Sequence, residues 1–109
     1  MGNKSDLLQG TLDLLILKTL DAGAMHGWGI SLRIQDVSGA VLQVNQGSLY
    51  PALHRLEESN LVKACWVVTA NKRRARVYEV TEDGLRRLER EEQRWRTVTL
   101  AVGRLLEEI

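Results

Sequence analysis

Apolar residues in the first part of the chain recur three and four residues apart, and this period predicts helices. The first helix is predicted over residues 5–22, with Ser5 or Asp6 capping its start and Gly23 ending it. It carries two apolar stripes on roughly opposite sides, one with Leu8, Leu12, Leu15 and Ile16 and the other with Leu7, Gly10, Leu14 and Leu17. A surface helix needs only one stripe, so the second is expected to pack on another partner, either in this chain or in a second subunit.

A second helix is predicted over residues 27–37, where Ile30, Ile34 and Val37 form its inward face. A serine and a glycine follow directly and end this helix. Residues 40–44, AVLQV, are too short for a helix, so they are expected to form either a small strand or an extended connector.

Residues 45–56 read NQGSLYPALHRL and predict a third helix that extends to about residue 59. Its apolar face contains Leu49, Leu53 and Leu56. Pro51 lies inside the stretch, and a proline in a helix interior costs about 3 kcal/mol. If the cap lies between Asn45 and Ser48, the proline falls near the first turn, where backbone N–H groups have no helical acceptor. The proline therefore predicts where the helix begins.

After Asn60 the apolar period shortens to about two residues, which is typical of strands. Residues 61–69 and 75–81 are rich in Val, Trp, Tyr and Thr and predict two antiparallel strands. Residues 70–74, ANKRR, lie between them and form the expected hairpin tip.

The rest of the chain predicts one helix of up to about 28 residues, or about 42 Å, with Thr81 as its N-cap. Its apolar residues follow a heptad pattern that is broken only at Glu91. The heptad residues expected at a dimer interface are Leu88, Trp95, Val98, Val102, Leu105 and Ile109. A domain of this size could not cover the whole helix, so the same helix of a second subunit is the expected cover. The alternative is that these residues belong to the core of the chain itself.

Composition narrows the functional classes. The 109 residues suit one domain, and the single cysteine, Cys65, excludes an intrachain disulfide. The longest apolar run, residues 14–17, is far too short to cross a bilayer, so we expect a cytoplasmic protein without a membrane partner. Neither histidine nor Cys65 has the spacing of a metal site, and no nucleotide-binding or catalytic motif occurs. The sequence therefore predicts no cofactor, no metal and no enzyme activity.

Two helices followed by a β-hairpin are typical of a winged helix-turn-helix, whose second helix enters the major groove while the hairpin tip lies against the DNA backbone. The net charge of +1 excludes a globally basic surface, yet residues 72–76 carry four positive charges. A phosphate backbone would compensate these cations and release counterions. The alternative is that the helix face and the tip are ordinary solvated surface. The residues expected to contact DNA are Gln46, Ser48, Tyr50, Pro51, His54, Arg55, Lys72, Arg73, Arg74 and Arg76.

The chain resembles the PadR family of transcriptional regulators. The resemblance rests on LLQGTLDLLILKTL in the first helix, HGWGI in the second, GSLYPALHRLEESNLV through the third, then Trp66, the segment KRRARVYEVTEDG and Trp95. It implies a mainly α (α+β) fold, with a DNA-binding winged helix-turn-helix in residues 1–80 and a C-terminal dimerisation helix in residues 81–109. It also implies a homodimeric bacterial repressor that binds an inverted-repeat operator and is released by a small aromatic molecule.

Two departures from the family pattern affect these expectations. The tip reads TANKRRAR, where the family more often has a glycine before the arginines, so Asn71 is expected to take the left-handed conformation. Glu91 lies one turn from Trp95 and favours neutral or cationic ligands. The expected ligand site is lined by Leu7, Gly10, Leu14, Glu91 and Trp95, with two Trp95 rings stacking on a flat molecule across the dimer axis. The alternative is that Trp95 packs on its copy and leaves no cavity.

The leading interpretation is therefore a homodimeric repressor that binds double-stranded DNA. The alternative is a winged-helix module that docks on another protein and does not bind DNA. The basic tip favours the first interpretation, because a protein-docking hairpin has no need of four clustered cations.

Overall fold

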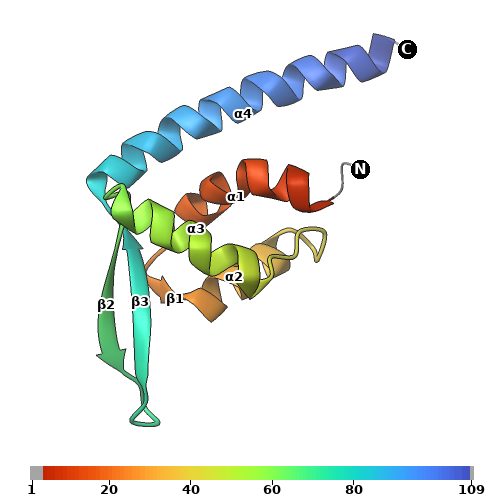
Figure 1. Ribbon diagram of the computed structural model, residues 1–109. Helices are drawn as coiled ribbons and strands as arrows, with labels where there is room; N and C mark the ends of the chain where they lie inside the picture. The colour runs from red at the N-terminus through yellow and green to blue at the C-terminus, as the bar shows by residue number, and fades with distance from the viewer. Residues whose placement is uncertain (1–3, 109) are drawn as a thin grey trace.

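The computed structural model describes the backbone of residues 4–108 and the side chains of residues 11–108. Within this part of the chain the elements follow the predicted order, with one additional short strand. They are α1 (Lys4–Asp21), β1 (Met25–His26), α2 (Gly27–Val37), α3 (Gln46–Glu58), β2 (Val62–Val68), β3 (Arg74–Val80) and α4 (Glu82–Glu108). In Figure 1, α1, α2 and α3 pack together, the β2–β3 hairpin projects away from them, and α4 extends beyond the other elements. The predicted winged helix-turn-helix with a long C-terminal helix is confirmed.

The sheet has the strand order β1-β3-β2, and both of its strand pairs are antiparallel. The two-residue strand β1 was not predicted, because two residues are too few to show an alternating pattern. It pairs Met25 with Tyr78 and thereby joins the start of α2 to the hairpin. Residues 40–44 contain no strand and form a connector, as one of the two alternatives expected.

The core lies between α1, α2, α3 and the near end of the hairpin. Its buried apolar residues are Leu12, Ile16, Leu17, Leu20, Ile30, Ile34, Leu49, Ala52, Leu53, Leu56, Leu61, Val62, Tyr78 and Leu88. The prediction that Leu17 faces away from this core is wrong. Leu17 is fully buried beside Ile16, so α1 uses one broad apolar face, with Leu14 and Leu15 half-buried at its edges. Leu7, Leu8 and Gly10 lie outside residues 11–108, to which the description of side chains and burial is confined.

Val37 is also misplaced by the periodicity, because it is 68% exposed. The packed part of α2 ends at Ile34, one turn before the helix ends. The bounds of α2 and its end at Ser38, by contrast, match the prediction.

Helix α3 begins as predicted, with the side chain of Asn45 accepting a hydrogen bond from the Ser48 N–H at 2.9 Å. The expected position of Pro51 near the first turn is wrong, since it is the sixth residue of α3 and therefore lies in the second turn. There the proline lacks the N–H that would have bonded to the Gly47 carbonyl. Gly47 is exposed, so solvent can hydrate this carbonyl and limit the cost.

Helix α4 starts at the predicted cap. The Thr81 hydroxyl accepts a hydrogen bond from the Gly84 N–H at 3.0 Å and donates one to the Asn60 carbonyl at 2.7 Å. The assignment of Leu88 to a dimer interface is wrong, because Leu88 is only 3% exposed and belongs to the core of its own chain. The first turns of α4 lie over α1 and β3, which explains this burial. Ile109 lies outside the described residues.

Gly84 leads to a stability prediction. A Cβ at this position would collide with the Leu61 carbonyl oxygen and lie 2.6 Å from Val80 Cγ2. We expect Gly84→Ala to lower the free energy of unfolding by about 3 kcal/mol in urea denaturation. Gly103→Ala is the matched control, since nothing within the described part of the chain lies within 4 Å of its Cβ position. This control should gain up to about 1 kcal/mol from helix propensity. Equal stability of the two variants would contradict the packing argument.

Candidate nucleic-acid interface

The outer face of α3 is accessible. Of its predicted contact residues, Ser48 is half-buried and the others are exposed, namely Gln46, Tyr50, Pro51, His54 and Arg55. This face follows from the helical period, because Leu49, Leu53 and Leu56 on the opposite side are almost fully buried. The structure therefore brings the predicted residues of α3 together on one surface.

Tyr50 lies at the junction of α3 with α2. A Cβ built on Gly27 would lie 2.7 Å from the Tyr50 hydroxyl oxygen, so the tyrosine packs directly on the backbone at the start of α2. That start is capped by His26, whose Nδ1 accepts a hydrogen bond from the Gly29 N–H at 3.0 Å. The His26 cap is a structural role that spacing rules for metal ligands could not reveal. No cluster of potential metal ligands occurs among the described residues.

Ion pairs flank the exposed face of α3 on both sides. Arg55 donates to Asp13 of α1 at 3.1 Å, and Arg76 of β3 donates to Glu57 of α3 at 2.7 Å. All four side chains are partly exposed, so each pair adds no more than about 1 kcal/mol to stability. The pairs matter because each one orients an arginine side chain whose partner could not be identified from the sequence.

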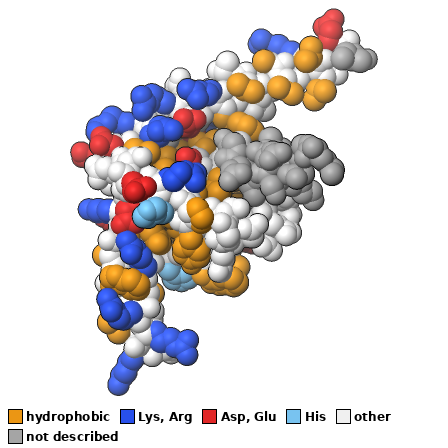
Figure 2. Space-filling model, in the orientation of Figure 1, with side chains coloured by type: hydrophobic (Ala, Val, Ile, Leu, Met, Phe, Trp, Pro, Cys, Tyr) orange, Lys and Arg blue, Asp and Glu red, His pale blue; other side chains and the backbone are white. Residues whose placement is uncertain are grey.

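Arg76 was predicted to act with the tip cations, but its environment differs from theirs. It lies within β3 and is half-buried, whereas the exposed cations at or beside the turn are Lys72, Arg73 and Arg74. Burial raises the pKa of the neighbouring Tyr78 phenol, with the positive charge of Arg76 opposing the rise and Glu57 adding to it. The basic tip is therefore composed of three cations, which project at the far end of the hairpin in Figure 2.

The turn at the tip differs from the prediction. The Thr69 N–H donates to the Arg73 carbonyl at 2.8 Å, which closes a loop of three residues. In such loops the last residue normally takes the left-handed conformation. Lys72 occupies that position with φ of +60°, so the assignment of the left-handed position to Asn71 is wrong.

The structure brings together some of the residues that were predicted to line the ligand site. A cavity of about 430 Å³ lies between α1 and α4, and its lining includes Leu14, Glu91 and Trp95. Leu7 and Gly10, also predicted there, lie outside residues 11–108, so the structure does not describe their place in this site. Trp95 is 45% exposed, so a single chain leaves much of its ring uncovered.

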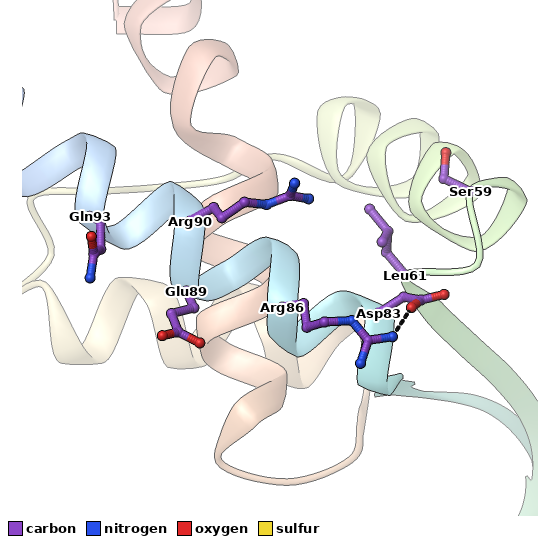
Figure 3. A pocket seen from close by; sticks show the side chains of 7 residues that line it. All are labelled: Ser59, Leu61, Asp83, Arg86, Glu89, Arg90 and Gln93. Atoms are coloured by element: carbon purple, nitrogen blue, oxygen red, sulfur yellow. Dashed lines mark hydrogen bonds and ion pairs between the residues drawn. The ribbon is translucent and has the colours of Figure 1, made fainter.

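A second depression lies beside the first turns of α4 (Figure 3) and has a volume of about 600 Å³. Its lining mixes both signs of charge, and Arg86 there is paired with Asp83. Because Arg86 is already paired with a carboxylate, this depression is a weaker candidate for a binding site than the basic tip and the face of α3.

The chain is similar to known transcriptional regulators both in sequence and in structure. Residues 16–90 match the Transcriptional regulator PadR-like family. A PadR family transcriptional regulator from Eggerthella lenta is 30% identical, with a TM-score of 0.80 over 94% of this chain and 88% of that chain. A PadR-like transcriptional regulator from Bacillus cereus is 27% identical, with a TM-score of 0.80 over 93% of this chain and 96% of that chain. Bacillus subtilis PadR in complex with operator DNA is 22% identical and shares the fold, with a TM-score of 0.66 over 72% of this chain and 45% of that chain.

The tip conformation leads to a second stability prediction. Because the left-handed conformation is strained for residues with a Cβ, we expect Lys72→Gly to raise the free energy of unfolding by about 1 kcal/mol. Asn71→Gly is the matched control and should be neutral or destabilising, since Asn71 has no positive φ. Thermal or urea denaturation distinguishes the two, and stabilisation by Asn71→Gly alone would contradict the observed turn.

Proposed function

Because the chain belongs to the transcriptional regulator PadR-like family and has its winged-helix fold, we propose that it is a homodimeric repressor that binds double-stranded operator DNA. The observation that carries the proposal is that one chain exposes both the polar face of α3 and a basic tip. Figure 2 shows Lys and Arg side chains at the far end of the projecting hairpin. Regulators of this family act by binding, so the proposal includes no catalytic step. Two copies of α3 would read the two halves of an inverted repeat, spaced by about one turn of DNA.

In the proposed complex, α3 lies in the major groove. The first turn of α3 would face a phosphate, with Ser48 and Tyr50 donating hydrogen bonds to it. His54 and Arg55 would reach base edges. Arg55 is held by Asp13 in the free protein, so contact with a base requires exchange of a carboxylate partner for a base acceptor. This exchange favours a base that offers two acceptors to the guanidinium, as guanine does through O6 and N7, which supports a role of Arg55 in sequence preference.

The hairpin would contact the DNA backbone through Lys72, Arg73 and Arg74. Each cation that neutralises a phosphate releases counterions and adds about 0.9 to the slope of log affinity against log salt. Arg76 contributes differently in this proposal. Its guanidinium bonds to Glu57 and therefore attaches the hairpin to α3.

The alternative is a winged-helix module that docks on another protein. The tip cations argue against it, because adjacent like charges repel each other and gain nothing from an apolar partner. Dependence of binding on salt separates the two functions.

We expect replacement of both Arg73 and Arg74 by alanine to weaken binding to all duplexes and to flatten the salt slope by up to about 2 units, measured by fluorescence anisotropy. His54→Ala or Arg55→Ala should instead alter sequence preference, with a cost of about 1–3 kcal/mol on the preferred site.

Arg104→Ala is the control for this measurement, because it removes an exposed cation from the far part of α4 and should leave binding unchanged. Unchanged affinity and slope in the Arg73 and Arg74 double variant would exclude the hairpin as a backbone contact.

We further propose that α4 mediates dimerisation. Apolar residues on one side of its second half are about half or more exposed, and the contacts of the described residues leave them largely uncovered; they are Trp95, Val98, Val102, Leu105 and Leu106. The extension of α4 beyond the other elements in Figure 1 supports pairing with a second copy. Leu88 is excluded from this interface by its burial in its own chain.

The cavity between α1 and α4 supports a proposed effector site. Leu14 and Trp95 offer apolar surface there, and Glu91 lines the cavity together with its ion-pair partners Arg87 and Arg94. A flat aromatic molecule suits this lining, with stacking on each Trp95 ring worth about 0.5–1.5 kcal/mol beyond burial. Its binding would shift α4 and so change the separation of the two α3 helices, which would release the operator.

The double variant Val98→Glu and Val102→Glu should be a folded monomer in sedimentation velocity, because two charges would be buried at the proposed interface. Leu100→Glu is the control, since Leu100 is exposed on the opposite side of α4 and its replacement should leave the dimer intact. A dimeric double variant would refute this interface. If the effector site needs both copies of Trp95, the monomer should also lose tryptophan quenching by a planar cationic dye.

A further inference from the structure

Trp66 is an apolar side chain in an exposed position on the hairpin. It lies in β2 and is 55% exposed, so burial in the core does not account for it. Two guanidinium groups lie over its indole ring, with Arg74 Cζ at 4.7 Å and Arg76 Cζ at 5.7 Å from the ring centroid. Trp66 is directly opposite Arg76 in the strand register, and Arg74 is two residues away on the same face. We call these three residues the Trp66 stack.

One end of the Trp66 stack is tied to α3. Arg76 donates from Nη2 to Glu57 Oε2 at 2.7 Å, and its guanidinium also lies 5.9 Å from the centroid of the Tyr78 ring. Arg76 therefore has a fixed place between the helix and the hairpin. Because its charge already has a carboxylate partner, Arg76 is better suited to holding the hairpin in position than to binding phosphate.

Arg74 forms the other end of the Trp66 stack. Within the described residues, no carboxylate lies within ion-pair distance of Arg74, and its guanidinium lies on the indole face instead. A guanidinium donates hydrogen bonds from its edge and stacks through its flat face, so stacking leaves its N–H groups available. The indole thus orients Arg74 without occupying the donors that a phosphate would use.

We propose that Trp66 is a positioning residue for DNA binding. It holds Arg74 ready for a backbone phosphate and, through Arg76 and Glu57, sets the position of the hairpin relative to α3. This inference rests on the proposed function, because it specifies how the hairpin of a DNA-binding protein is organised before DNA arrives. It also assigns a reason for an exposed tryptophan beside two arginines.

The expected effect of Trp66→Ala is a loss of preorganisation. Arg74 would still be present to neutralise a phosphate, but it would have to be immobilised on binding. We expect affinity to fall about three- to tenfold for every duplex, with the salt slope retained. Arg74→Ala should instead reduce the slope by about 1 unit. Trp66→Phe keeps a flat ring and should restore most of the affinity.

A double-mutant cycle tests whether Trp66 acts through Arg74. If it does, combining Trp66→Ala with Arg74→Ala gives a loss clearly smaller than the product of the two separate losses. Val67→Ala is the control, since this adjacent residue lies on the other face of β2 and should bind as the parent does. Independent, multiplying losses would show that Trp66 does not act through Arg74, and this result would overturn its proposed role in positioning that arginine.

A measurement without DNA keeps the inference separate from the proposed function. The Arg74 side-chain protons should show ring-current shifts in the NMR spectrum of the free protein, and Trp66→Ala should abolish these shifts while Val67→Ala retains them. Failure of the parent to bind any duplex would refute the proposed function. Parent-like binding by a folded Trp66→Ala variant, or the absence of ring-current shifts in the parent, would overturn the role of Trp66 alone.

Discussion

Burial of one face of α3 is the interaction on which the remaining structure depends. Leu49, Leu53 and Leu56 are at most 3% exposed, and full burial of a leucine side chain contributes about 1.5–3 kcal/mol. Because residues on a helix follow a fixed period, burying these leucines turns Pro51 and His54 outward. Packing of the core therefore determines the candidate interface, because the face of α3 that remains exposed is the one that could face DNA.

The same core determines how charge is distributed over the surface. The chain has a net charge of +1, yet it has a basic tip because carboxylates are placed against other arginines. Asp13 pairs with Arg55 and Glu57 with Arg76, and these acids lie on elements that pack beside each arginine. The cations of the tip lie beyond the reach of both acids at the far end of the hairpin. A nearly neutral protein can therefore present a local cationic surface, and the proposed DNA contact needs no excess of positive charge over the whole chain.

The first turns of helix α4 are packed on the rest of the chain, whereas its second half is largely exposed. The change occurs where α4 extends beyond the other elements. Gly84 allows its first turns to approach the Leu61 carbonyl, and Leu88 then enters the core. One face continues beyond the packed elements with Trp95, Val98 and Val102 about half exposed. A single apolar stripe thus stabilises the monomer at one end and, in our proposal, joins two copies at the other. This arrangement would couple the cavity near Trp95 to the positions of the two α3 helices.

The sequence by itself determined the features that depend on near neighbours. The bounds of α2, the Thr81 cap, a cap for α3 between Asn45 and Ser48, and the hairpin were predictable because helical periods, capping bonds and strand alternation act within about four residues. The resemblance in sequence also predicted the family, and the match of residues 16–90 to that family confirms it. Only the tertiary structure decided which arginines are held, since Arg55 and Asp13 are 42 residues apart and Arg76 and Glu57 are 19 residues apart. It likewise placed Leu17 and Leu88 in the core, because burial depends on which elements meet, and no local pattern records that meeting. The left-handed position of Lys72 depends on the register of the two hairpin strands, which the sequence pattern left open.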